Sequence, residues 1–342
     1  MNAHQSLYRK YRPASFKEVV GQDHVTSVLI DQIAAEKVPH AFLFSGSRGL
    51  GKTSIARIFA KELDTSTKDI YEIDAASNNS VEDIRSLTEN VHTLPFESKY
   101  KVYILDEVHM LSKSAWNAFL KTLEEPPAHT IFIMATTELE KVPETVRSRC
   151  QVFELKRPTR KVLAGHIGAI ATKEKRKTEA GAIDLISLLA EGSYRDALST
   201  LEKVLSLSEG TVIGREEVEK ITGAPKYAYI ASLVEALSKN DTATALTTIS
   251  QIEQNDIDFG LFLTLLLEHI RTILLLMYAP ELKQELKKEI DEDVFADMER
   301  IAKDGASHIS DKTLLALLDA ASRMRYSPVK AVPLELAVLS LR

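Results

Sequence analysis

A glycine-rich segment that ends in lysine and threonine carries the strongest chemical signal in this sequence. The segment reads Gly46-Ser47-Arg48-Gly49-Leu50-Gly51-Lys52-Thr53 and fits the pattern G-x-x-x-x-G-K-[ST]. Glycines let the backbone curl so that its N–H groups face an anion, and the lysine adds a positive charge for the outer phosphates. The threonine hydroxyl is a ligand for magnesium. The segment therefore predicts a site for the phosphates of a nucleotide.

Two carboxylates follow an apolar run farther along the chain. Val102 to Leu105 is continuously apolar and leads directly into Asp106 and Glu107. Asp106 is placed to hold magnesium through its water shell, and Glu107 to orient or polarise an attacking water. Two acids after a strand form a solvated turn more often than a site. Downstream of a phosphate loop, however, they predict hydrolysis of the nucleotide.

Three further residues have two readings each on the residues alone. Thr137 ends another apolar run and is a candidate for a hydroxyl near the γ-phosphate, although threonine is common at strand ends. Arg149 is either a functional cation or the partner in a surface ion pair. Arg195 begins a helix and is either a nucleotide contact or a structural cation paired with Asp196.

The cysteine and histidine content argues against other chemistry. The single cysteine, Cys150, excludes an internal disulfide and a thiolate metal cluster, which suits a reducing cytosol. Because no base for it is identifiable, Cys150 is interpreted as a small buried apolar residue rather than a nucleophile. The nine histidines are scattered without zinc-ligand spacing, so no zinc is expected.

Short apolar runs and helical segments alternate in the first half of the chain. The predicted strands are Ala41 to Ser45, Ile70 to Ile73, Val102 to Leu105, Ile131 to Ala135 and Val152 to Leu155. Continuous apolar runs suit a parallel sheet that is covered by helices on both faces. Predicted helices include Ser54 to Leu63, directly after the phosphate loop, and Ser112 to Glu125. The fold class is therefore α/β, built of βα units.

After about Leu155 the strand signal disappears, and helices are predicted to the end of the chain. Leu261 to Ala279 is the most apolar stretch, but charges near its middle favour a buried helix over a membrane span, so no membrane contact is expected. The layout predicts an α/β domain at residues 1–158, a small helical domain at 159–223 and a larger helical domain at 224–342.

The charge balance and one helix start bear on nucleic acid. A net charge of -6 argues against a protein coated in positive charge, but not against DNA contact through a local surface. Asn78, Asn79 and Ser80 precede a helix expected to start near Val81, whose free N–H groups can take a DNA phosphate, with Arg85 one turn further on. The competing interpretation is a simple helix cap made by Ser80 with Asp83 three residues later.

Several longer blocks resemble the bacterial clamp-loader gamma/tau subunits of DNA polymerase III. These blocks begin at the N-terminal side and recur nearly throughout the chain: Leu7-Tyr8-Arg9-Lys10-Tyr11-Arg12-Pro13, Glu72-Ile73-Asp74-Ala75-Ala76-Ser77-Asn78-Asn79, Asp106-Glu107-Val108-His109-Met110-Leu111-Ser112, Leu120-Lys121-Thr122-Leu123-Glu124-Glu125-Pro126-Pro127, Ala135-Thr136-Thr137-Glu138, Ser148-Arg149-Cys150 and Gly192-Ser193-Tyr194-Arg195-Asp196-Ala197-Leu198-Ser199. Val332-Pro333-Leu334-Glu335-Leu336-Ala337 is similar to the end of the family's collar domain.

The resemblance implies an AAA+ P-loop ATPase with a five-stranded parallel sheet, a helical lid and an all-α collar that holds a pentamer together. By motif matching it implies Thr137 as the first nucleotide sensor, Arg195 as the second, and Arg149 as an arginine finger given to the ATP of a neighbouring subunit. Such a finger is worth ~10³–10⁵ in rate. The adenine pocket is expected near Tyr8, Arg12 and Val20.

The implied function is that of an ATP-driven subunit, acting with magnesium, that helps open the sliding clamp (beta) and load it onto primed DNA. The implied partners are the delta and delta-prime subunits and further gamma/tau copies. Two alternatives stay open: a non-hydrolysing structural subunit of the same assembly, and another AAA+ DNA motor such as a branch-migration helicase. Residues Lys61 to Asp69 are short and cysteine-free, so the family's four-cysteine zinc module is expected to be absent.

Overall fold

The computed structural model describes residues 5–208, 210 and 212–341. Its internal contacts divide the chain into two compact units. The first unit runs as far as His166 and takes in Ala190–Ser199, and the second holds Ile167–Leu189 and the chain from Thr200 onward. The division of the chain into three domains at 1–158, 159–223 and 224–342 stays a prediction.

A five-stranded parallel sheet forms the centre of the first unit. Its strand order is β2-β3-β4-β1-β5, with these bounds: β1 Ala41–Ser45, β2 Ile70–Asp74, β3 Lys101–Asp106, β4 Thr130–Thr136 and β5 Gln151–Glu154. The predicted α/β class and the five predicted strands are therefore confirmed. The register pairs Ser45 with Thr136 and Asp74 with Asp106, so the strands end along one common edge. In parallel sheets, ligands bind at this carboxyl edge.

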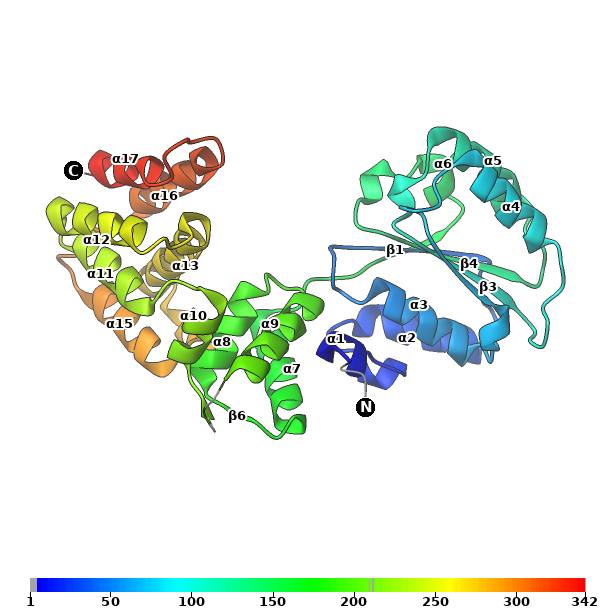
Figure 1. Ribbon diagram of the computed structural model, residues 1–342, viewed down its shortest axis with the longest axis horizontal. Coiled ribbons are helices and arrows are strands. Elements are labelled where there is room, and N and C mark those ends of the chain that lie inside the picture. The colour runs from blue at the N-terminus through cyan, green and yellow to red at the C-terminus, as the bar shows by residue number, and fades with distance from the viewer. Residues whose placement is uncertain (1–4, 209, 211, 342) are drawn as a thin grey trace. The chain divides into compact units, whose positions relative to one another are not determined.

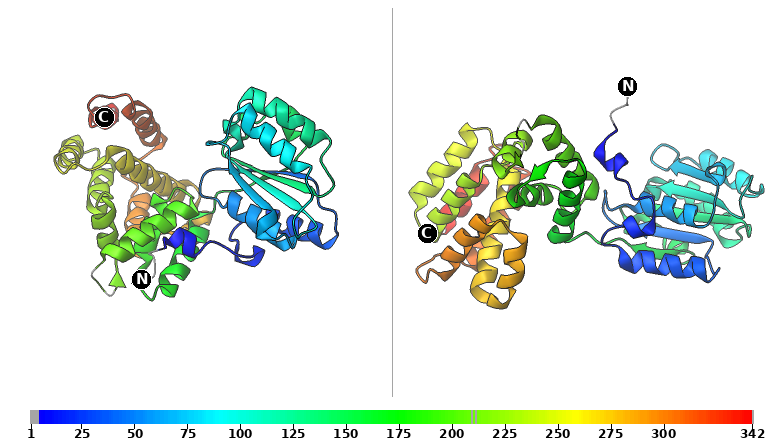
Figure 2. Two further views of the ribbon diagram at one scale, coloured as in Figure 1. Left: turned by 45° about the vertical axis from the view of Figure 1, so that its right-hand side comes forward. Right: turned by 90° about the horizontal axis from the view of Figure 1, so that it is seen from below.

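Helices lie on both faces of this sheet (Figures 1 and 2). The helical elements of the unit are α1 Leu7–Lys10, η1 Phe16–Glu18, α2 Asp23–Ala34, α3 Lys52–Glu62, η2 Thr67–Asp69, α4 Val81–Val91, η3 Val108–Met110, α5 Lys113–Glu124, η4 Leu139–Lys141 and α6 Glu144–Arg147. Helices α7 Arg160–Lys173 and α9 Tyr194–Leu207 each lie partly in this unit and partly in the second.

Alternate residues of the strands fill two separate apolar cores. Phe42 and Ile104 pack with side chains of α2 and α3, on the blue side of the sheet in Figure 1. Leu43 and Leu105 pack with side chains of α4 and α5, on the cyan side. Successive side chains of a strand point to opposite faces, so a continuous apolar run is what a sheet buried on both faces requires. This packing fixes the strand ends that carry the site.

The second unit is helical apart from one pair of very short strands (Figures 1 and 2). Besides the remainders of α7 and α9, its elements are β6 Lys177–Thr178, α8 Ala180–Leu189, β7 Val212–Ile213, α10 Arg215–Thr222, α11 Tyr227–Ser238, α12 Thr242–Gln254, α13 Phe259–Tyr278, η5 Pro280–Leu282, α14 Lys283–Glu289, α15 Glu292–Lys303, α16 Asp311–Met324 and α17 Val332–Ser340.

Strands β6 and β7 correct the expectation that no strand follows Leu155. They pair in parallel, with Lys177 opposite Val212 and Thr178 opposite Ile213. Each strand has only two residues, so neither contains the alternation of apolar and polar residues that marks a strand in a sequence.

Helix α13 is the central helix of the second unit. By length and composition it would span a membrane, yet half of its most apolar window is buried inside this unit. Phe262, Leu266 and Ile270 are fully buried and belong to one core with side chains of α11, α15 and α16. The apolar run is therefore explained by burial in the core, as the sequence predicts.

Candidate nucleotide-binding site

The glycine-rich segment forms the loop between strand β1 and helix α3. Gly49 and Gly51 have φ of 79° and 96°, a left-handed conformation that glycine adopts readily. Gly51 is the N-cap of α3 and makes no side-chain cap bond to the first turn. A Cβ at Gly51 would meet nothing within 4 Å, so the space before the helix is open. An uncapped helix N-terminus that faces open space is suited to bind an anion.

Lys52 lies inside this loop. Its Nζ donates hydrogen bonds to the carbonyl oxygens of Gly46, at 2.7 Å, and Ser47, at 3.1 Å. The residue is only 6% exposed. Burial lowers the pKa of its ammonium group, and the charges of Glu107 and Asp106 oppose that shift. The loop therefore holds a buried ammonium group where the sequence motif predicts one.

Asp106 and Thr53 meet at the carboxyl edge of the sheet. The Thr53 hydroxyl donates to Asp106 Oδ2 at 2.6 Å, and the backbone N–H of Glu107 donates to Asp106 Oδ1 at 3.0 Å. Both side chains offer oxygen atoms, which are the ligands that magnesium prefers. The two residues proposed as magnesium ligands are thus brought together, although 53 positions separate them in the sequence.

Glu107 is turned toward the end of strand β4. The Thr137 hydroxyl donates to Glu107 Oε2 at 3.2 Å, so the predicted sensor contacts the predicted water-orienting carboxylate. The contact arises because β3 and β4 are neighbours in register, with Leu105 opposite Met134. Thr137 does not line the cavity described next.

A cavity of about 330 Å³ opens beside the phosphate loop. This volume is within the range of small-molecule sites. Its lining contains most of the residues that the sequence predicts for nucleotide binding, together with apolar neighbours: Tyr8, Arg9, Tyr11, Arg12, Pro13, Glu18, Val19, Val20, Arg48, Gly49, Leu50, Gly51, Lys52, Thr53, Ser54, Ile55, Asp106, Glu107, His166, Tyr194, Arg195 and Leu198. The loop residues Gly46 and Ser47 are not part of this lining, but their carbonyl oxygens accept hydrogen bonds from Lys52.

The start of helix α9 closes one side of the cavity. The Arg195 guanidinium lies 5.0 Å from the centre of the Tyr8 ring, a cation–π contact. The neighbouring Tyr194 donates its hydroxyl to the carbonyl oxygen of Val20 at 2.9 Å and its backbone N–H to Gly49 O at 3.2 Å. Burial raises the pKa of Tyr194 to about 12. Tyr194 was not predicted as a site residue, because nothing local in the sequence links it to the phosphate loop.

Arg149 lies elsewhere in the first unit. Its Nη2 donates to Glu124 Oε1 and its Nη1 to the Thr145 carbonyl oxygen, both at 2.6 Å. The side chain is 36% exposed, and Arg149 is not among the residues that line the cavity. The structure therefore does not bring Arg149 to the phosphate loop of its own chain.

The candidate DNA contacts stand at the start of α4. Ser80 Oγ accepts from the Asp83 N–H at 3.2 Å, and the Asp83 carboxylate accepts from the Ser80 N–H at 3.1 Å. This is the capping box that the sequence offers as the competing interpretation. Asn78 donates to the Asp74 carbonyl oxygen at 3.0 Å, and Arg85 is exposed on the helix. Asn79 is exposed beside them.

A histidine and a glutamate that received no role from the sequence adjoin Glu107. His109 Nδ1 lies 3.4 Å from Glu107 Oε2 and 3.1 Å from Thr136 Oγ1. His109 Nε2 lies 3.3 Å from Glu138 Oε1. Lys141, 2.7 Å from the other oxygen of Glu138, holds the pKa of that carboxyl below its usual range. His109 and Glu138 both lie in sequence blocks that resemble the gamma/tau subunits, but only the fold shows that the two side chains meet.

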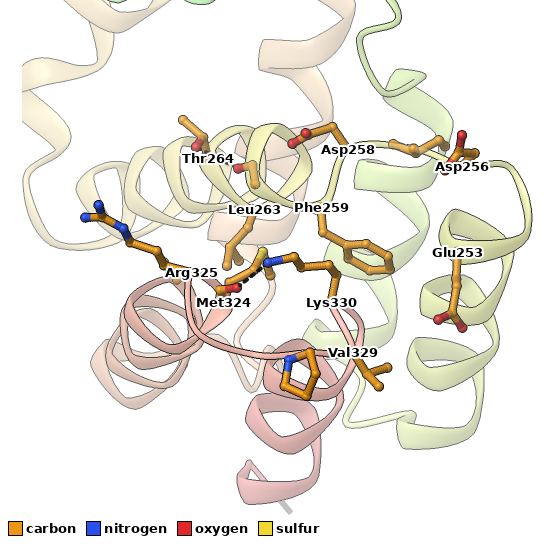
Figure 3. A pocket seen from close by; sticks show the side chains of 14 residues that line it. Glu253, Asp256, Asp258, Phe259, Leu263, Thr264, Met324, Arg325, Val329 and Lys330 are labelled. Carbon is orange, nitrogen blue, oxygen red and sulfur yellow. Dashed lines mark hydrogen bonds between the residues drawn. The ribbon is translucent and has the colours of Figure 1, made fainter.

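The second unit has a larger cavity of about 960 Å³ (Figure 3). Glu253 and Asp256 lie at one end of it and Arg325 at the other. Lys330 donates its ammonium to the Met324 carbonyl oxygen at 3.0 Å. Within the part of the chain that the structure describes, no lining side chain has a buried polar atom without a hydrogen-bond partner. The cavity by the phosphate loop is the better candidate for a functional site, because Lys52, Thr53 and Asp106 line it together.

Family models for components of DNA polymerase III match successive parts of the chain. Residues 63–159 match the delta subunit of DNA polymerase III. Residues 162–210 match the ATPase lid domain of the DNA polymerase III clamp loader subunit. Residues 213–342 match domain III of the DNA polymerase III subunits gamma and tau.

Curated relatives of this chain are also subunits of DNA polymerase III. The DNA polymerase III subunit tau of Bacillus subtilis is 41% identical over 317 residues, which cover 86% of this chain and 56% of the relative. The DNA polymerase III subunit gamma of Buchnera aphidicola subsp. Schizaphis graminum is 32% identical over 357 residues, which cover 98% of this chain and 97% of the relative. The chain thus spans about half the length of the tau relative and nearly all of the gamma relative.

Solved structures show the likeness of fold. The RuvB Holliday junction branch migration motor of Thermotoga maritima matches with a TM-score of 0.54 and 24% identity, over 66% of this chain and 79% of that chain. At this identity the match speaks for the fold alone. The near-complete match to a gamma subunit decides the family: the chain belongs to the gamma/tau clamp-loader subunits of DNA polymerase III, with an α/β AAA+ domain, a lid domain and a helical domain III.

Proposed function

We propose that this chain is an ATP-hydrolysing clamp-loader subunit that helps open the replicative sliding clamp and load it onto primed DNA. The observation that carries the proposal is the convergence of Lys52, Thr53 and Asp106 on one cavity at the carboxyl edge of the sheet. Phosphate-loop NTPases place a lysine, a hydroxyl and a carboxylate at this edge for phosphates and magnesium.

The nucleotide would lie along the cavity from the loop toward α1. Its phosphates would face the N–H groups of the loop and of the first turn of α3, where Gly51 leaves open space. Its adenine would contact Tyr8, Arg12 and Val20, which line the cavity together with Leu198. Arg195, already over the Tyr8 ring, would reach the nucleotide from α9. These placements fit the size and mixed apolar and cationic lining of the cavity.

The chemistry of the donor set fits magnesium. Thr53 and Asp106 present oxygen atoms 2.6 Å apart, and they would hold the ion together with the phosphates. Bound there, magnesium supplies positive charge that neutralises the β- and γ-phosphate oxygens.

Hydrolysis would depend on three residues of this protein. Glu107 orients the attacking water and accepts its proton, and Lys52 stabilises the charge that develops on the phosphate oxygens. Arg149 supplies further positive charge to the ATP of a neighbouring subunit. Its absence from the lining of its own cavity and its 36% exposure support that role, because a finger given to a neighbour must lie on the surface.

Assembly with other subunits would bring each Arg149 to a neighbouring cavity. The expected assembly is a pentamer with delta, delta-prime and further gamma/tau copies, working in the bacterial cytoplasm on the beta clamp and primer-template DNA. Exposed apolar side chains on the last two helices support such contacts: Leu315 is 62% exposed, Leu318 49%, Leu336 51% and Leu339 39%. Leu315 and Leu318 on α16, like Leu336 and Leu339 on α17, are three positions apart, so the two members of each pair share a helix face.

The working cycle follows from linkage. ATP bound between neighbouring subunits would order a spiral that holds the clamp open, and primed DNA would align Arg149 with Glu107 and the ATP. Hydrolysis would then release the closed clamp. ATP drives the cycle only if it binds the clamp-gripping state more tightly than the released one.

DNA contact at the start of α4 is part of the same proposal. The N-terminus of α4 directly follows Asn78, Asn79 and Ser80, and Arg85 adds an exposed cation. If Arg85 meets a phosphate, Arg85→Ala weakens primed-DNA binding at every sequence alike and reduces the salt slope by about one. A binding constant and salt slope unchanged by the substitution would remove Arg85 from the DNA contact.

The test of the proposal is ATP hydrolysis in the presence of clamp and primed DNA. Lys52→Ala should abolish hydrolysis, because the phosphates lose their buried cation. Lys37→Ala, which changes an exposed lysine, is the matched control and should leave it intact. A wild-type chain that neither binds nor hydrolyses ATP would favour the non-hydrolysing structural subunit instead. The family match removes the support for a branch-migration helicase, since the RuvB likeness extends only to the fold.

A further inference from the structure

His109 stands between two carboxylates of the first unit. On one side, Nδ1 lies 3.4 Å from Glu107 Oε2, and on the other, Nε2 lies 3.3 Å from Glu138 Oε1. The side chain is only 8% exposed. Carboxylate oxygens accept hydrogen bonds, so each ring nitrogen faces an acceptor. A nearly buried ring in this position bridges Glu107 to Glu138.

The end of strand β4 holds the other parts of this bridge. Thr136 Oγ1 lies 3.1 Å from His109 Nδ1 and accepts the Glu138 N–H at 3.0 Å. Thr137 donates its hydroxyl to Glu107 at 3.2 Å. Three successive residues, Thr136 to Glu138, thus contact either Glu107 or its neighbour His109. The carboxylate of Glu107 and the end of β4 are joined into one hydrogen-bonded group.

The backbone of Glu107 has an unfavourable conformation that its neighbours must hold in place. Its φ is 49°, a left-handed conformation that a side-chain-bearing residue adopts at an energetic cost. Such residues persist where the surrounding structure fixes them. Val108 and His109, in the short helix η3 that follows, supply a buried and a nearly buried side chain directly after the strained residue.

We propose that His109 is a positioning residue that holds the carboxylate of Glu107 at the end of β4, in the orientation needed for ATP hydrolysis. The inference rests on the proposed ATPase function. His109 does not line the nucleotide cavity, so it acts through Glu107 and not on the nucleotide. Its loss therefore slows turnover and leaves ATP affinity unchanged. Partners that orient metal ligands are typically worth about 10- to 100-fold, and we expect a loss of the same size for His109.

The experiment compares three variants in clamp- and DNA-stimulated hydrolysis by the full chain. His109→Ala removes both contacts, and kcat should fall about 10- to 100-fold with KM for ATP changed less than about two-fold. His109→Asn keeps an N–H donor near the position of Nδ1, on the Glu107 side. His109→Gln keeps one near Nε2, on the Glu138 side. The Asn variant should therefore retain more kcat than the Gln variant.

Controls separate this inference from the function on which it rests. His24→Ala changes an exposed histidine whose Nε2 lies 3.0 Å from the Glu154 carbonyl oxygen, and should keep the wild-type kcat. Thermal unfolding of each variant checks the fold, and the Asn and Gln variants decide the matter if the Ala variant does not fold. Hydrolysis absent from the wild-type chain overturns both proposals. Wild-type hydrolysis with equal kcat in the Asn and Gln variants, or with unchanged kcat in the Ala variant, overturns the role of His109 alone.

Discussion

Lys52 and Arg149, two cations assigned to the same reaction, have opposite surroundings. Lys52 is 6% exposed and bonded to two carbonyl oxygens of its own loop. Arg149 has a side chain that is 36% exposed, on the turn after α6, where it pairs with Glu124. The packed core of the sheet sets the position of the first, while a surface ion pair sets that of the second.

The difference indicates which half of the proposed catalytic machinery is complete within one chain. The phosphate loop, Thr53 and Asp106 meet without help from another subunit. Exposed ion pairs contribute about 0–1 kcal/mol, so Glu124 holds Arg149 only weakly and a neighbouring subunit can take it over. The predictions below test this contrast, beginning with the largest effect.

Among the substitutions considered below, replacing Arg149 should have the largest effect on turnover. We expect Arg149→Ala to lower kcat by ~10³–10⁵ with little change in ATP affinity, because the arginine stabilises charge in the transition state on a neighbour. Arg149→Lys should restore little of this, since an ammonium lacks the planar fork of donors. Steady-state hydrolysis and equilibrium ATP binding measure the two quantities.

Arg57 provides the matched control for Arg149. It also makes an exposed ion pair, with Glu72, and both side chains are 40% exposed. Arg57→Ala should hydrolyse ATP at the wild-type rate. Equal losses in the two variants would mean that removing any surface arginine harms the protein, and the contrast between the two regions would fail.

The thiol beside Arg149 reports whether its turn is packed. Cys150 donates its thiol to the Val146 carbonyl oxygen at 3.1 Å, and burial raises its pKa to about 12. Since only the thiolate reacts, alkylation at pH 8 should be about 10³-fold slower than for a free thiol of pKa ~8.5. The rate with iodoacetamide measures this. Alkylation as fast as that of a free thiol would show that the turn opens readily and that Arg149 has no defined position.

Gly49→Ala tests how closely the phosphate loop is fitted to α9. An added Cβ would lie 2.0 Å from Ser193 Oγ at a φ of +79°. A left-handed residue other than glycine costs ~1–2 kcal/mol, so ATP affinity should fall about ten-fold. Calorimetric titration with ATP measures it. The double variant with Ser193→Ala should recover part of the loss, and full affinity in the single variant would show that the loop tolerates the change.

Glu124→Gln should have the smallest effect. The substitution weakens the ion pair that holds Arg149 at 2.6 Å, but a pair of this exposure is worth about 0–1 kcal/mol. We expect kcat to change less than about five-fold in either direction. A loss comparable to that of Arg149→Ala would mean that Glu124 itself takes part in the reaction.

Local patterns in the sequence were enough to predict the five strands of the parallel sheet, the phosphate loop and the position of Asp106 at a strand end. Each depends on neighbouring residues, through runs of apolar side chains or required glycines. Tyr8 and Arg195 needed the family resemblance, since their contact joins segments far apart in the sequence. Tyr194 and His109 were missed because their partners Val20 and Glu138 come close only when the chain folds.

The most direct test of the account mixes two inactive variants. Lys52→Ala has an inactive nucleotide site but keeps Arg149. Arg149→Ala keeps an intact nucleotide site but lacks the arginine finger. Each is assayed alone for clamp- and primed-DNA-stimulated ATP hydrolysis, and then the two are mixed so that subunits exchange. The account predicts that mixing restores hydrolysis, because Arg149 acts across a subunit interface. Two variants that stay inactive after verified exchange would contradict it.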